Sequence, residues 1–251
     1  MRPYILAETN WKNLKASQID LAILPWGATE AHNYHLPYST DNIEAEQIIY
    51  RSAELAYNRG AKLIVLPAIP FGVNTGQADI LLNMNLNPGT QFSIIKDLIQ
   101  VLDRQGIRKF LIFNSHGGNE FKPLLRELGL LFPEMFLSVA DFYNVLDKKE
   151  YFELEGDHAD EMETSLMLYL RPDLVINKKY WGKGIEKKIN LKYFNEKWAW
   201  TERKWSKVTS DTGIGNPEFA TREKGERYFQ DLTQKVGDML FELCTTEVGY
   251  F

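Results

Sequence analysis

Short apolar runs recur along the first 140 residues of the chain, and longer amphipathic stretches separate them. The runs are rich in leucine, isoleucine, valine and phenylalanine, and each is only five or six residues long. Runs of this length and composition are typical of strands that are buried on both faces of a sheet. We therefore expect strands at 21–25, 62–67, 109–113 and 135–140.

Helical patterns fill the intervals between these runs. In the clearest example, 91–105, apolar residues recur at i, i+3, i+4 and i+7 from Ile95 to Leu102, and Gly106 follows as a C-terminal cap. The same reasoning predicts helices over 41–59, 120–131, 159–170 and 217–243. Strands that alternate with helices form parallel sheets, so the predicted fold class is α/β, with three layers and a mostly parallel sheet flanked by helices.

Composition favours one large domain over residues 1–251, because 44% of the residues are hydrophobic. The net charge is −5 and the basic residues are dispersed, so we expect no nucleic-acid partner. Cys244 is the only cysteine, which excludes an intrachain disulfide. No apolar stretch reaches the length of a membrane span, and we expect a soluble, cytoplasmic protein with no membrane partner.

All four histidines fall in three short clusters that also hold carboxylates or paired glycines. Two of these clusters come just after predicted strands, where open α/β sheets bind their ligands. Imidazole and carboxylate groups together bind metals or move protons. The clusters are TEAHNYHLP, NSHGGN and GDHADEMETS.

The first cluster offers metal ligands on an extended segment. Glu30 and His32 are two residues apart, so both side chains point to one side of the chain. Asp41 follows at a predicted helix start, where its carboxylate could bridge two cations. The role of His35 stays open between a hydrogen bond to Asp41 or to the substrate and ordinary packing.

The second cluster follows the third predicted strand. His116 supplies a further ligand, and Gly117 and Gly118 allow close backbone approach and could present N–H groups to an oxyanion or a substrate. A phosphate loop is a weaker reading, because no Lys-Ser/Thr pair follows the glycines. The chain also contains no G-x-S-x-G and no H-E-x-x-H, which excludes a serine esterase and a zinc-protease helix.

The third cluster surrounds the start of a predicted helix. Glu163 lies about one turn into this helix and could complete the coordination of a second metal. His158 precedes the helix and is the candidate general acid for a leaving nitrogen. Asp157 or Asp160 could orient His158, although Asp160 has a simpler explanation as an acid that favours the helix dipole.

A polar, lysine-rich segment at about 175–212 holds most of the tryptophans of the chain. Large amphipathic rings of this kind could cover an active-site mouth, pack between subunits, or pack locally. The tryptophans concerned are Trp181, Trp198, Trp200 and Trp205.

The motifs LPWGATEAHNYHLPYSTD, NSHGGN, HADEMETSLML and GNPEFATREKGERYF occur in this order, and over about 5–229 the chain resembles the creatininase (creatinine amidohydrolase) family. The resemblance implies an α/β amidohydrolase with two metals that assembles as a homohexamer. It also implies that Asp41 bridges the metals and that His158 and Glu163 are the histidine and glutamate of the family's H-A-x-x-x-E-T-S segment. By motif position, the metal ligands fall on Glu30, His32, Asp41 and His116.

The chain departs from the family pattern in two places. Ala31, Asn33 and Tyr34 replace a glutamine, a glycine and a proline, which would reshape the pocket wall. True creatininases carry His-Tyr-Glu where this chain has His-Gly-Gly, and that glutamate binds their second metal. Gly118 has no side chain that could bind a metal, so either Glu163 takes over this coordination or the second metal site is weak and exchangeable. The chain therefore resembles a His-Gly-Gly branch of the family, which includes a formamide deformylase and a peptidase for a modified precursor peptide.

These observations predict a hydrolase that cleaves a non-peptide C–N bond of a small molecule, a cyclic amide or a formamide, by metal-bound hydroxide. Zinc and manganese are the expected metals, and iron(II) also suits an imidazole and carboxylate site. An alternative is a metal-stabilised binding or scaffold protein that kept the fold and lost turnover. A nucleotide-binding α/β protein, which rests on the glycine loop alone, is a further alternative.

Overall fold

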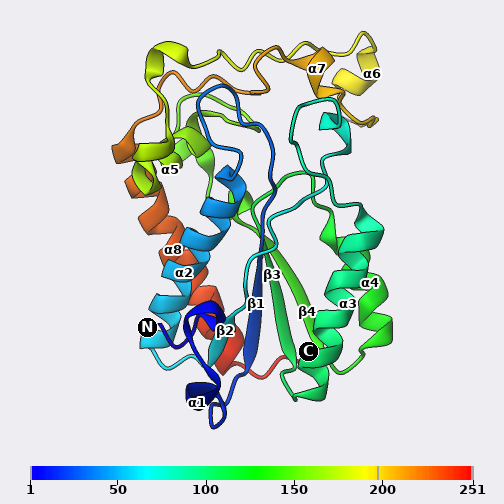
Figure 1. Ribbon diagram of the computed structural model, residues 1–251, viewed down its shortest axis with the longest axis vertical. Helices are drawn as coiled ribbons and strands as arrows, with labels where there is room; N and C mark the ends of the chain where they lie inside the picture. Colours follow the sequence, from blue (N-terminus) through cyan, green and yellow to red (C-terminus); the bar gives the residue numbers. More distant parts are fainter. Residues whose placement is uncertain (1, 197, 250–251) are drawn as a thin grey trace.

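The computed structural model describes residues 2–196 and 198–249, and within them four strands form one parallel sheet in the order β2-β1-β3-β4 (Figure 1). The central strands β1 and β3 pair along their whole length, from Leu21 opposite Lys109 to Trp26 opposite Asn114. The strands are β1 (Leu21–Trp26), β2 (Leu63–Val65), β3 (Lys109–Asn114) and β4 (Phe136–Asp141). The predicted α/β class with a parallel sheet is confirmed.

Helices cover both faces of the sheet. One layer contains α2 (Thr40–Asn58), α5 (Glu161–Leu170) and α8 (Arg222–Thr245), and the other contains α3 (Pro88–Arg104) and α4 (Phe121–Leu131) (Figure 1). The shorter helices are α1 (Trp11–Leu14), α6 (Lys192–Asn195) and α7 (Trp205–Val208), with 3-10 turns at Leu6–Glu8, Thr75–Gln77, Phe142–Asn144, Lys148–Glu150, Pro172–Leu174 and Lys178–Tyr180.

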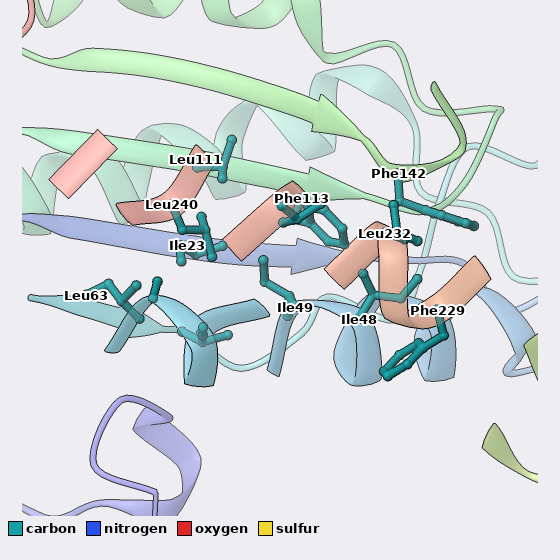
Figure 2. Close-up of a cluster of buried hydrophobic side chains, with 14 of the residues drawn as sticks. Ile23, Ile48, Ile49, Leu63, Leu111, Phe113, Phe142, Phe229, Leu232 and Leu240 are labelled. Carbon is teal, nitrogen blue, oxygen red and sulfur yellow. The ribbon is translucent and has the colours of Figure 1, made fainter. Parts of the chain in front are cut away.

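Alternate residues of each central strand point into two separate hydrophobic cores, as the period of two dictates. Ile23 and Phe113 pack with Ile48 of α2 and Leu232 of α8 (Figure 2). Their neighbours along the strands, such as Leu24, pack on the other side against α3 and α4. Both faces of the strands are therefore buried, and this explains why the strands are almost purely apolar.

Helix ends differ from the sequence prediction where a side chain caps the helix. The Asp160 carboxylate accepts hydrogen bonds from the N–H groups of Met162 (2.9 Å) and Glu163 (3.0 Å), so α5 begins at residue 161 rather than 159. The Thr221 hydroxyl accepts from the N–H of Lys224 in the same way. The last helix therefore begins at residue 222, and the stretch from 217 forms a turn before it.

The tryptophan- and lysine-rich segment 175–212 crosses the end of the molecule at which the strands end, yellow to orange in Figure 1. Its described residues form short helical turns joined by extended chain. Among the described residues, no helix combines the length and the apolar character that a membrane crossing requires.

Candidate metal centre

Six titratable side chains from four parts of the chain meet beyond the ends of β1 and β3. Each is at most 7% exposed. Ligand atoms lie within 4.8 Å of one another in three groups. The groups are Glu30, Asp41 and His116; Glu30, His32 and His158; and His32, Asp41 and Glu163. The fold thus brings together every residue that the sequence suggested as a metal ligand, and it adds His158 to the same cluster.

Each element contributes for a local reason. Glu30 and His32 lie on the loop that follows β1, and Asp41 is in the first turn of α2, where the helix dipole favours a carboxylate. His116 comes two residues after the end of β3. A hydrogen bond from the Ser115 hydroxyl to the carbonyl of Asp41 (2.7 Å) ties the β3 loop to α2.

The three histidines of the cluster share one hydrogen-bonding arrangement. One ring nitrogen of each donates to a backbone carbonyl: His32 Nδ1 to Glu30 (3.1 Å), His116 Nε2 to Val73 (3.0 Å) and His158 Nε2 to Ala31 (2.8 Å). A carbonyl can only accept, so that nitrogen carries the hydrogen. In a neutral imidazole the other nitrogen then presents a lone pair.

The remaining ring nitrogens face carboxylate oxygens. His32 Nε2 lies 3.1 Å from Asp41 Oδ1, and His116 Nδ1 lies 3.0 Å from Glu30 Oε1 and 3.1 Å from Asp41 Oδ2. His158 Nδ1 lies 3.6 Å from Glu30 Oε1. Lone pairs and carboxylates repel each other unless a proton or a cation lies between them, so this donor set fits divalent cations.

Electrostatics within the cluster are strong because its members are buried. Burial alone would raise the pKa of the Asp41 carboxyl, but His32 and His116 outweigh it and hold that pKa below its usual range. Burial opposes a charge on His32, yet Asp41, with Glu163 and Glu30, raises its pKa to about 10. Protons on His32 and His116 therefore balance the carboxylates when cations do not.

The other two members of the cluster have different protonation. Burial, followed by the neighbouring charge of His32, lowers the pKa of His158 and favours its neutral form. Burial raises the pKa of the Glu163 carboxyl to about 8. The Glu163 carboxylate also accepts a hydrogen bond from the N–H of Ala159, which holds it at the start of α5.

His35 lies outside the ligand groups. Its Nε2 is 2.8 Å from the Thr164 hydroxyl, and its ring stacks on Trp181 with 4.7 Å between the ring centres. His35 is 1% exposed, so its surroundings are those of a packed core residue. Of the alternatives left open for His35, its Nε2 bonds to Thr164 rather than to Asp41, and contact with a substrate stays a prediction.

The expectation that Asp157 or Asp160 orients His158 is wrong. The Asp157 side chain is half exposed and pairs with Arg203 at 2.9 Å rather than with His158. Asp160 caps α5. The carbonyl of Ala31 orients His158 instead, and no sequence pattern predicts this contact because any residue supplies a carbonyl.

Two adjacent glycines follow His116 and differ in their surroundings. A Cβ on Gly117 would have no atom within 4 Å. A Cβ on Gly118 would lie 2.4 Å from the Val73 carbonyl oxygen and 2.5 Å from His116 Nε2. The glycine at 118 therefore makes room for the hydrogen bond that orients His116.

Trp205 of α7 covers the cluster. Its ring meets the ring of His158 edge to face at 4.7 Å between centres, and it is 9% exposed. Trp198 and Trp200 are 70% and 84% exposed and lie outside this contact. Trp205 therefore lies over the cluster, and a role of segment 175–212 in covering an active-site mouth stays a prediction.

The sequence model of the creatininase family, described as creatinine amidohydrolase, matches residues 7–240. The chain belongs to the creatininase family. The creatininase-family member creatinine amidohydrolase of Pseudomonas putida is 29% identical over 194 residues, which cover 68% of this chain and 73% of that protein.

Solved structures agree with this family assignment. A candidate creatinine amidohydrolase from Bacteroides fragilis NCTC 9343 is 39% identical, with full coverage of both chains and a TM-score of 0.93. A Glu-to-Gln variant of creatininase complexed with creatine is 22% identical over 97% of this chain and 99% of its own, with a TM-score of 0.81, and so shares the fold. Creatininase structures of a zinc–zinc type and with manganese share the fold as well.

Proposed function

We propose that this creatininase-family protein is a metal-dependent amidohydrolase that cleaves a non-peptide C–N bond in a small cyclic amide or formamide. The observation that carries the proposal is the shared arrangement of His32, His116 and His158. Each histidine donates one nitrogen to a backbone carbonyl and turns the other toward a buried carboxylate. This is how metal-ligating histidines are oriented in proteins.

The residues suit two neighbouring cations that share one carboxylate. Glu30, Asp41 and His116 would hold one cation, and His32, Asp41 and Glu163 the other. Glu163 then supplies the carboxylate that Gly118 lacks. Zinc or manganese is the expected metal, since both suit mixed nitrogen and oxygen ligands and both occur in creatininase structures. Divalent cations bound there would supply Lewis acidity and lower the pKa of a water molecule toward neutrality.

His158 is proposed to move the proton. Only its Nδ1 is free, because Nε2 is bound to the carbonyl of Ala31. Burial keeps the ring neutral, so Nδ1 can accept a proton from water and then deliver it to the leaving nitrogen. The exposed backbone at Gly117 and Gly118 is the proposed donor to the oxyanion.

Enclosure of the cluster supports a small substrate. The six side chains are at most 7% exposed, and Trp205 closes one side. A homohexameric assembly is proposed from the family resemblance alone, and a cytoplasmic location is proposed from the sequence pattern.

Removal of His116 tests the proposal. The wild-type protein is expected to hold two equivalents of zinc or manganese in elemental analysis and to hydrolyse at least one member of a panel of cyclic amides and formamides, creatinine included. The His116→Ala variant should lose at least one equivalent and the hydrolysis. The Asp157→Asn variant is the matched control: it removes a carboxylate next to His158 that lies outside the cluster, and it should keep both.

His116→Ala protein that keeps both metals and full activity would contradict the proposal. Stoichiometric metal in a wild-type protein that hydrolyses no member of the panel would favour the alternative, a metal-stabilised binding or scaffold protein.

A further inference from the structure

The two carboxylate oxygens of Glu30 have different surroundings. Oε1 lies 3.0 Å from His116 Nδ1, 3.6 Å from His158 Nδ1 and 3.9 Å from His32 Nε2. Oε2 accepts a hydrogen bond from the side-chain amide of Gln77. Gln77 is 2% exposed, so no water competes for this bond. One oxygen therefore faces the histidines while the other is already bound to the protein.

A second amide fixes the direction of this hydrogen bond. The Asn83 Nδ2 donates to Gln77 Oε1, and Asn83 Oδ1 accepts from the backbone N–H of Ala31 at 2.8 Å. A backbone N–H can only donate, so Asn83 must turn its oxygen to Ala31 and its NH₂ group to Gln77. Gln77 must then turn its own NH₂ group to Glu30. The orientation of both amides follows from a single backbone donor.

The loop that carries Asn83 is held in a conformation that leucine rarely adopts. Leu82 has a φ of 61°, in the left-handed region that favours glycine. Hydrogen bonds on both sides maintain it: the Tyr38 hydroxyl donates to the carbonyl of Leu81 (2.8 Å), and the N–H of Met84 donates to the carbonyl of Thr29 (2.9 Å). The strained position directly precedes Asn83 and directs its side chain toward Gln77.

We propose that Gln77 and Asn83 are positioning residues that hold Glu30 as a one-oxygen metal ligand, with Oε1 toward the cations. The inference rests on the proposed function, because it assumes that the cluster binds metal. Neither amide touches the reacting atoms, and both act through Glu30. Such outer contacts fix the orientation of a ligand, and their loss typically weakens metal binding about 10- to 100-fold.

The Asn83→Asp variant should reverse the direction of the hydrogen bonds from Asn83 to Gln77 and from Gln77 to Glu30, with almost no change in side-chain shape. A carboxylate at 83 still accepts from Ala31 but cannot donate, so the Gln77 amide must turn over to donate to it. Gln77 Oε1 then faces Glu30 Oε2, oxygen against oxygen. If Asn83 had no positioning role, the added negative charge at 83 would strengthen cation binding. If Gln77 and Asn83 position Glu30, the reversed hydrogen bonds should weaken it. The two effects have opposite signs.

The measurement is transfer of zinc from the loaded protein to a chromophoric chelator, with unfolding of the metal-free protein as the check on folding. We expect the Asn83→Asp variant to bind at least one zinc about 10- to 100-fold more weakly than the wild type, with metal-free unfolding close to that of the wild type. The Gln77→Met variant, which removes both bonds with a side chain of similar length, should show the same loss.

Asn85→Asp is the matched control on the same loop. Asn85 also accepts a hydrogen bond from a backbone N–H, that of Asn74 (2.8 Å), and donates one to a side-chain oxygen, that of Asn87 (2.7 Å). This series of hydrogen bonds leads to the amide of Asn87 and not to a carboxylate of the cluster. Its zinc affinity should equal or exceed that of the wild type. Zinc binding by Asn83→Asp and Gln77→Met at the wild-type level would overturn the inference, while a wild-type protein that binds no zinc would instead overturn the proposed function.

Discussion

Substitution of Gly118 tests how the backbone shapes the candidate metal centre. A Cβ there would meet the Val73 carbonyl oxygen at 2.4 Å and His116 Nε2 at 2.5 Å, whereas ordinary contacts begin at 3.4 Å. These two atoms are the partners of the hydrogen bond that orients His116. The Gly118→Ala substitution must therefore push them apart by about an ångström, and one of them belongs to the backbone.

The expected cost follows from this geometry. Forcing one extra carbon into a packed site destabilises a protein by about 1–3 kcal/mol, and the lost hydrogen bond accounts for about 1 kcal/mol of that sum. The misaligned His116 should also weaken zinc binding about 10- to 100-fold. Denaturant unfolding of the metal-free protein measures the first effect, and competition with a chelator measures the second.

Gly117→Ala is the matched control, because the same carbon on the preceding residue would have no atom within 4 Å. Its free energy of unfolding should stay within about 0.5 kcal/mol of the wild type, with unchanged zinc affinity. The reasoning is refuted if the two alanine variants behave alike, whether both are tolerated or both are damaging.

Two further predictions concern buried acids beside the cluster. Burial, followed by the nearby charges of Glu163 and Asp41, raises the pKa of Glu44 well above 4.5. As the pH rises, the Glu44 carboxyl loses its proton in the unfolded chain before it does so in the folded protein. Between pH 4.5 and the raised pKa of folded Glu44, the metal-free wild type should therefore lose about 1.4 kcal/mol of stability per pH unit. Glu44→Gln should gain stability over the wild type as the pH rises, and parallel pH profiles of unfolding would contradict this. Asp160→Ala should cost about 1 kcal/mol in the free energy of unfolding through loss of the α5 cap, and Asp160→Asn much less, so equal losses would argue against capping.

The sheet and the clustering of the candidate ligands follow from short-range signals in the sequence. Strands buried on both faces must be apolar throughout, and this is why Leu21–Trp26 and Lys109–Asn114 stand out in the sequence. Because parallel strands end at one edge, the residues after them were expected to meet, and Glu30 and His116 do. These predictions needed only periodicity and topology.

The supporting residues could not be found in this way. Gln77 and Asn83 lie 47 and 52 positions from Glu30 and Ala31, and an amide in a polar loop looks like any surface residue. Their role depends on the path of the loop, which no local pattern encodes.

The error over Asp157 has a local cause. The backbone at His158 is extended, in an antiparallel bridge to Ile214. Successive side chains of an extended segment point to opposite sides. Asp157 therefore points to Arg203 although it is next to His158 in the chain.

The carbonyl groups that hold the three histidines have a consequence for how this protein can diverge. The acceptors belong to the backbone of Glu30, Val73 and Ala31, and mutation of a side chain does not remove them. Substitutions at 31 and 73 that preserve the chain path leave the histidine tautomers unchanged. The orientation of the three histidines therefore depends on the path of the backbone at 30, 31 and 73, and side chains at these positions can change without altering it.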